Sequence, residues 1–126
     1  MTIDLEDRRL SNAPEPPYLA VIFTSIQRDG PLDGYGQTAM EMVRLAAGQD
    51  GYIGFESARD ENGTGITISY WRDDNSIKNW KRQADHMAAP KAGRNQWYQP
   101  YVTRIARVER HYSFENKTYN SLLNRL

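Results

Sequence analysis

The chain has 126 residues with 16 basic and 16 acidic side chains and no cysteine. This length predicts one domain, and the lack of cysteine excludes disulfides and the usual thiolate sites for zinc or iron–sulfur clusters. The balanced charge leaves no basic stripe, so we expect neither nucleic acid nor a membrane surface as partner. The apolar runs are too short to cross a membrane and the first ten residues are charged, so we expect a cytoplasmic protein.

The N-terminal residues 1–17 are predicted to form an extended arm that ends in Pro14, Pro16 and Pro17. Residues 18–114 are predicted to form the domain, and residues 115–126 a polar tail. The first expected strand covers residues 18–27, and both of its alternating sets of side chains are apolar. Such a strand needs cover on both faces.

A helix and a hairpin follow this strand. The helix is expected between Asp33, which can cap it, and Gly48, because apolar side chains recur at helical spacing at Ala39, Met42, Val43 and Ala46. Residues 52–59 and 65–71 alternate like strands. Asn62-Gly63 between them accepts the positive φ of a hairpin turn.

A second helix is expected after Asp73 or Asp74, either of which can cap it. Its buried stripe is predicted to be Ile77, Trp80, Ala84 and Met87. Pro90 and Gly93 interrupt this helix, and the last strand is expected over residues 101–112.

The order strand, helix, strand, strand, helix, strand predicts an α+β fold of the ferredoxin-like βαββαβ type. Both helices should cover one face of a four-stranded antiparallel sheet. Strands that are apolar on both sides would leave the other face as a large exposed patch. Two copies packed sheet to sheet about a two-fold axis would cover it, so we expect a homodimer.

Several segments between residues 17 and 114 carry a resemblance to a known family. They are the first strand, residues 51–59, residues 68–71, Ile77-Lys78-Asn79-Trp80, and Val108-Glu109-Arg110. In this order and combination they resemble the antibiotic biosynthesis monooxygenase (ABM) family of dimeric α/β barrels.

The resemblance implies a small monooxygenase that needs no metal, flavin or haem prosthetic group. Such enzymes oxidise a polycyclic phenol or quinol whose own anion reacts with oxygen. The family also includes haem-degrading enzymes, for which haem is the substrate. In that branch the iron-ligating histidine lies about three turns beyond the helix tryptophan, where this chain has Pro90. A third alternative is a non-catalytic dimeric module that binds a small aromatic molecule.

All three tryptophans fall between residues 69 and 97, which predicts a pocket for a planar molecule between sheet and helices. In the resemblance, Trp80 matches the helix tryptophan of the family's oxygenases and Asn79 is its neighbour. We expect catalytic roles for His86, Trp80 and Asn79. The predicted lining residues are Tyr52, Tyr70, Trp71, Arg94 and Trp97.

The alternative for most of these residues is a structural role. Trp80 has the spacing of a core residue, and Tyr70 and Trp71 must point to opposite faces of the sheet, with the choice left open. On a straight helix His86 lies on the polar side with Asn79 and Gln83; the alternatives are an exposed histidine or a base near neutral pKa.

The charged side chains of the last strand have a similar pair of interpretations. His111 is expected to make a polar contact across strands. Arg104 and Arg107 are expected to form surface pairs, the alternative being stabilisation of an anion.

Overall fold

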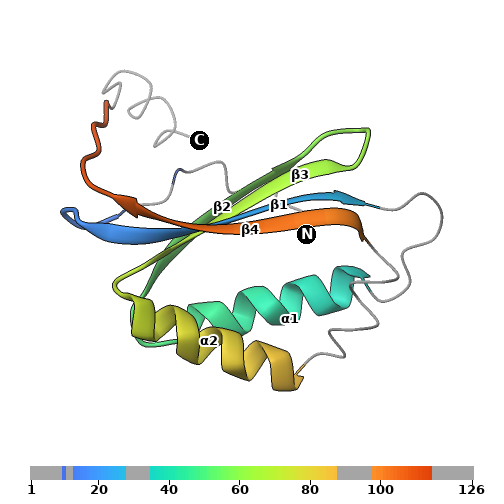
Figure 1. Ribbon diagram of the computed structural model, residues 1–126, viewed down its shortest axis with the longest axis horizontal. Coiled ribbons are helices and arrows are strands. Elements are labelled where there is room, and N and C mark those ends of the chain that lie inside the picture. The colour runs from blue at the N-terminus through green and yellow to red at the C-terminus, as the bar shows by residue number, and fades with distance from the viewer. Residues whose placement is uncertain (1–9, 11–12, 28–34, 88–97, 115–126) are drawn as a thin grey trace, which may run out of the picture.

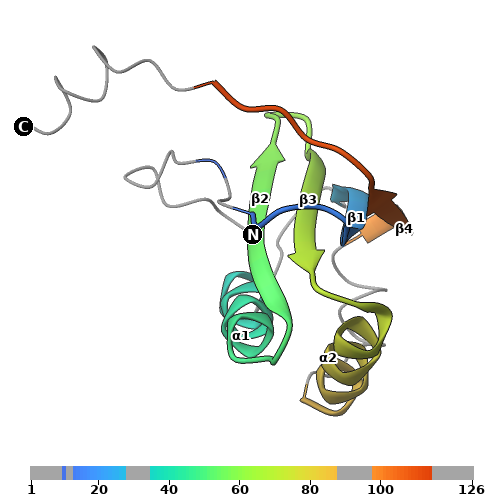
Figure 2. The ribbon, with the colours of Figure 1, turned by 90° about the vertical axis from the view of Figure 1, so that its left-hand side faces the viewer.

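A computed structural model of the protein describes residues 10, 13–27, 35–87 and 98–114 (Figure 1). The elements are β1 (Tyr18–Gln27), α1 (Tyr35–Ala47), β2 (Tyr52–Arg59), β3 (Thr64–Trp71), α2 (Asp74–Met87) and β4 (Tyr98–Val108). The strands form one antiparallel sheet in the order β2-β3-β1-β4. Both helices lie on one face of it (Figure 2). The predicted ferredoxin-like α+β fold is confirmed.

The hairpin between β2 and β3 is built by its polar turn residues. The Asp60 carboxylate accepts hydrogen bonds from the backbone N–H groups of Asn62 at 3.0 Å and Thr64 at 2.9 Å. Gly63 has a φ of 87°, which a residue without Cβ adopts at little cost. The Asn-Gly signal in the sequence therefore marked this turn correctly.

The cap of α2 is Asp73, which resolves the choice between the two aspartates. Its carboxylate accepts hydrogen bonds from the backbone N–H of Ser76 at 2.9 Å and from the Ser76 hydroxyl at 2.6 Å. These two bonds, with a third from Arg72, lower the pKa of Asp73 to about 2. Asp74 instead pairs with Lys78 one turn later, at 3.0 Å.

The last strand is displaced from its expected position. It begins at Tyr98 and ends at Val108 rather than covering residues 101–112. Val108 pairs with Tyr18, the first residue of β1, and the preceding Pro17 has no N–H with which to continue the ladder. Residues 109–112 therefore follow the strand without pairing. The expected arm, except residues 10 and 13–17, and the expected tail lie outside the described residues.

The alternation of β3 settles which aromatic side chain faces the helices. Trp71 is fully buried in a core with Val21, Ala46 and Ile77, against which Leu19, Tyr52 and Trp80 pack. Tyr70 lies on the opposite face, where its ring meets Tyr18 edge to face at 5.8 Å. Its hydroxyl donates a hydrogen bond to Glu56 at 2.6 Å.

The face of the sheet away from the helices is largely apolar. Ile66 and Val102 lie opposite Thr24 in the register and are 45% and 40% exposed. Ile22, Ile68 and Ala106 share this face by alternation. We call it the bare face. Within the described part of the chain, no helix is long and apolar enough to cross a membrane.

Candidate functional site

The layer between the sheet and the helices changes character along its length. At one end, near the start of α2, large rings fill it. Trp71 and Trp80 are stacked with centroids 5.2 Å apart, and Tyr52 meets Trp71 edge to face at 5.6 Å. Burial raises the pKa of Tyr52. We call this region the packed end, because its own rings fill most of the layer around Trp71.

At the other end, near the β2–β3 hairpin, the helix-facing side chains of the sheet are small. The register places Ser25 beside Gly65, and the next row holds Ser57 and Thr67. The hydroxyls of Ser57 and Thr67 are 2.9 Å apart and hydrogen-bonded, and Ser25 is only 1% exposed. We call this region the open end, because glycine and hydroxyl side chains contribute little volume to the layer.

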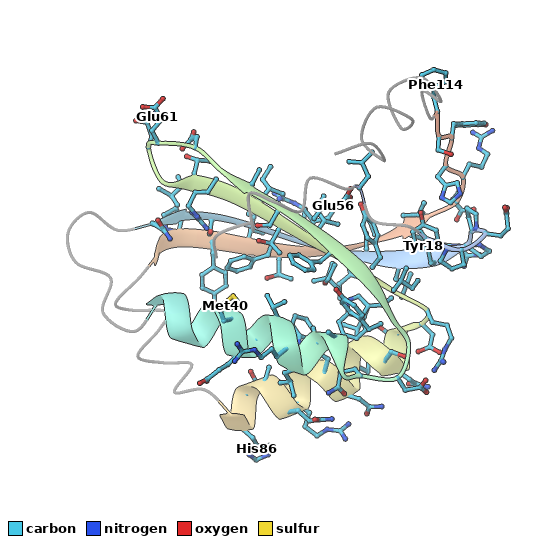
Figure 3. The ribbon with its side chains drawn as sticks, turned by 180° about the vertical axis from the view of Figure 1, so that it is seen from behind. Tyr18, Met40, Glu56, Glu61, His86 and Phe114 are labelled. Carbon is cyan, nitrogen blue, oxygen red and sulfur yellow. The ribbon has the colours of Figure 1, made fainter. Side chains whose placement is uncertain are left out.

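Larger side chains at the open end remain accessible to solvent although they lie in the layer. Figure 3 shows Met40 on the side of α1 that faces the sheet, yet it is 43% exposed. Tyr101 lies on the same face as Ser25, and its ring is 5.4 Å from Phe23. Tyr101 is 41% exposed. Among the described residues, Met40 and Tyr101 are therefore more exposed than the core residues of the packed end.

The indole N–H groups of the two stacked tryptophans differ. Trp71 donates to the Ser69 hydroxyl at 2.8 Å. Trp80 Nε1 is buried and has no hydrogen-bond partner. Nearly all buried donors in proteins are paired, so this N–H is a candidate to bind an added acceptor. An oxygen atom of a bound molecule is such an acceptor.

Arg59 was not identified from the sequence. Its side chain crosses the sheet over Gly65, where an added Cβ would lie 2.5 Å from the guanidinium carbon. Arg59 Nη2 donates to the Ser25 hydroxyl at 2.9 Å, and Nη1 donates to the Gly63 carbonyl. Arg59 Nε is buried without a partner. The available signal was a glycine inside a strand, which often marks the close approach of another group.

The residues predicted for the site are divided among three places. Trp80, Trp71 and Tyr52 lie together at the packed end. Asn79 is exposed on α2, and His86 is exposed near its C-terminal end, pointing away from the sheet (Figure 3). Tyr70 lies on the bare face, and Arg94 and Trp97 lie outside the described residues.

The polar residues at the start of β1 and around the end of β4 form structural contacts. The Tyr18 hydroxyl lies 2.8 Å from His111 Nδ1, which confirms the polar contact expected for this histidine. Arg107 pairs with Glu109 at 2.9 Å and both are exposed. The described residues contain no cluster of three or more side chains suited to hold a metal ion.

A surface hollow of about 240 Å³ lies between the start of β1 and the start of α2. Its charged side chains are paired with one another or with neighbours. Arg72 bonds both oxygens of Asp50 at 3.0 and 3.1 Å and also reaches Asp73 at 3.0 Å. These contacts tie the loop before β2 to the cap of α2, so we interpret the hollow as structural.

Comparison with known proteins gives a family match over residues 17–92, to the family described as antibiotic biosynthesis monooxygenase. The chain is 47% identical over 109 residues to the uncharacterized protein YqjZ of Bacillus subtilis, covering 86% of this chain and 95% of YqjZ. It is 30% identical over 93 residues to the jasmonate monooxygenase ABM of Pyricularia oryzae. That match covers 71% of this chain but only 42% of the fungal enzyme.

Solved structures share the fold. PA3566 from Pseudomonas aeruginosa matches with a TM-score of 0.60 at 17% identity, covering 79% of this chain and all of that one. SnoaB from Streptomyces nogalater, described as a cofactor-independent oxygenase, matches with a TM-score of 0.59 at 11% identity, covering 80% of this chain and all of SnoaB. At these identities the likeness concerns the fold alone.

Proposed function

The chain belongs to the antibiotic biosynthesis monooxygenase family, and on that premise we propose that it is a cofactor-independent oxygenase acting on a planar phenol or quinol. The substrate enters the layer between sheet and helices through the open end. There it lies beside Phe23, Tyr101 and Met40, and in this proposal it extends along the layer until one of its oxygen atoms reaches Trp80 Nε1.

One observation carries this proposal: the buried indole N–H of Trp80 has no acceptor. A phenolate, a quinone and a peroxide all present oxygen atoms that accept a hydrogen bond. A preorganised, buried donor stabilises the charge that develops on such an oxygen. Trp80 therefore has two roles here, since one face of its ring stacks on Trp71 while its N–H serves the substrate.

The reaction draws its electrons from the substrate. Loss of a proton from an anthrone-type CH₂ group gives a carbanion whose charge is delocalised onto the conjugated carbonyl oxygen. The carbanion adds O₂ to form a carbon–oxygen bond, and protonation gives a hydroperoxide. Loss of water then leaves a carbonyl group, so that CH₂ and O₂ become C=O and H₂O.

His86 is not the proton acceptor in this scheme. It is exposed and points away from the sheet, so it cannot reach the layer from its described position (Figure 3). Water at the accessible open end takes the proton instead. A His86→Gln variant is therefore expected to turn over at the wild-type rate.

The proposal includes a homodimer formed through the bare face. Isoleucine and valine side chains that are 38–45% exposed lie there, on the same face as Tyr18 and Tyr70: Ile26, Ile66 and Val102. A second copy would bury this patch with two-fold symmetry. Sedimentation should give a dimer for the wild type and a monomer for Ile66→Asp, and a wild-type monomer would contradict the assembly.

The activity is tested with an anthrone and ¹⁸O₂. The purified chain should consume oxygen and place one ¹⁸O atom in the new carbonyl, and no product should form without oxygen. Equal product yields with and without oxygen would remove the oxygenase assignment. Tight binding without turnover would indicate a binding module, and a Soret shift with added hemin would indicate haem chemistry.

A further inference from the structure

We propose that Arg59 binds the anionic oxygen of the molecule held at the open end, and that the site therefore selects acidic phenols and enols over neutral aromatic compounds. This rests on the proposed location of the substrate. It extends the proposed function by naming the charge state that is recognised and the group that recognises it.

Arg59 has no carboxylate partner among the described residues. Arg59 forms no ion pair with any carboxylate of the described residues, whose ion pairs involve Arg72, Lys78 and Arg107 instead. A partly buried guanidinium without an anion has lost hydration and gained little in exchange. An anionic ligand would supply the missing partner.

The Arg59 guanidinium also has an N–H donor without an acceptor, at Nε. A guanidinium has five N–H groups. Two are directed to the Ser25 hydroxyl and the Gly63 carbonyl, which fix the side chain against β1 and the hairpin. The buried Nε–H has no acceptor. This donor is free to bind an oxygen atom of a ligand in addition to the two contacts that fix the side chain.

The side chains around the Arg59 guanidinium suit an aromatic anion. Gly65 lies under the guanidinium, and Ser25, Ser57 and Thr67 line the same part of the layer. Hydroxyl groups can donate to an oxygen anion in addition to the guanidinium. In the register Tyr101 lies next to Ser25, so an aromatic side chain is placed beside the charged one. This combination suits a ring that carries an ionised oxygen.

Arg59 would also affect the ionisation of the bound phenol or enol. A guanidinium beside a phenol or enol favours the ionised form and so lowers the pKa of the bound compound. The anion is the form that reacts with oxygen in the proposed scheme. Arg59 would thus prepare the substrate without itself transferring a proton.

The probe for this proposal is 4-nitro-1-naphthol, whose neutral and ionised forms absorb at different wavelengths. It is titrated with pH in the absence of oxygen, free and bound to the full chain. The wild type should lower the pKa of the bound probe by about one pH unit. Arg59→Gln should abolish this shift and Arg59→Lys should keep part of it. The matched control is Arg82→Gln, because Arg82 is exposed on α2 and should have no effect.

A second measurement needs no variant and remains informative if Arg59→Gln does not fold. Above the pKa of the free probe, the wild type should bind the naphtholate at least tenfold more tightly than its methyl ether, which cannot ionise. Equal affinities, no binding of the naphthol, or an unchanged shift in a folded Arg59→Gln variant would overturn the proposal. Because no oxygen is present, these results do not depend on turnover. Normal ¹⁸O incorporation together with equal affinities would remove the role of Arg59 alone.

Discussion

The packed end and the open end belong to the same layer but differ in the size of the side chains that the sheet strand β3 contributes to them. At the packed end the sheet contributes Trp71 and Leu19, and α2 contributes Ile77 and Trp80. At the open end the sheet contributes glycine, serine and threonine, and Met40 on α1 remains 43% exposed. Stability is therefore expected to concentrate at the first end and ligand binding at the second.

The strand β3 shows how the difference arises within eight residues. Its helix-facing positions change from Gly65 and Thr67 to Ser69 and Trp71, whereas Ile66 and Ile68 lie on the bare face. The apolar side of this strand thus points away from the helices for most of its length. Along β3, the bulky side chains therefore lie on the bare face and at the packed end, and small side chains lie at the open end.

The largest expected effect is on stability at the packed end. Trp71→Ala should lower the free energy of unfolding by about 3–5 kcal/mol, because it empties a fully buried site and removes two ring contacts. Met40→Ala at the open end should cost less than about 1 kcal/mol, since its side chain is largely accessible. Urea denaturation of the two variants measures the contrast. Equal costs would mean that both ends are core.

Gly51 and Gly63, which both have a positive φ, provide a second comparison. Gly51 has a φ of 90°, and an added Cβ would lie 2.6 Å from the Ser76 Cβ next to the cap of α2. Gly51→Ala should therefore cost roughly 2–4 kcal/mol, from backbone strain together with overpacking. Gly63→Ala in the hairpin meets nothing nearer than 3.4 Å and should cost only the strain, about 1 kcal/mol. Thermal unfolding midpoints in the reverse order would contradict this account.

Substitutions of the two stacked tryptophans are expected to differ in their effects on turnover and on stability. Trp80→Phe keeps an aromatic ring against Trp71 but removes the unpaired N–H, and should slow oxygen consumption roughly 10- to 100-fold. The matched change Trp71→Phe removes a donor that Ser69 already satisfies, so it should affect unfolding more than turnover. Initial rates and denaturation midpoints for both variants test this. An unchanged rate in Trp80→Phe would remove the N–H from the chemistry.

The smallest expected effect is the loss of stability at low pH through Asp73. The pKa of Asp73 is lowered to about 2, from an ordinary value near 3.8, chiefly by hydrogen bonds from Ser76. Its contribution to stability is therefore complete above about pH 4 and is lost as the pH falls towards 2. Asp73→Asn should flatten that part of the stability profile relative to the wild type. Parallel profiles between pH 4 and 2 would show that the cap does not titrate as described.

The sequence predicted the order of elements because alternation, helical spacing and the Asn-Gly turn are local signals. It did not place the ends of β4, which depend on where β1 stops pairing at Tyr18. It also left open which of Tyr70 and Trp71 faces the helices, since both alternating sets contain apolar residues. That choice depends on how the helices pack on the assembled sheet.

The site could be predicted only in part. Trp80 was predicted for the site because it is an aromatic residue at helical spacing, and its role there stays a prediction. Arg59 was missed because its position is set by three strands at once: it starts on β2, crosses Gly65 on β3 and reaches Ser25 on β1. His86 was favoured for its chemistry, but the rotation of α2 directs it away from the sheet (Figure 3).

The central claim is that the open end holds the substrate. The most direct measurement is a crystal structure of the chain soaked with an anthrone without oxygen. We predict the planar rings between α1 and the sheet, beside Met40 and Phe23, with an oxygen atom accepting from Trp80 Nε1. An anthrone bound on the bare face, or an open end filled by the chain's own side chains with the ligand excluded, would contradict the account.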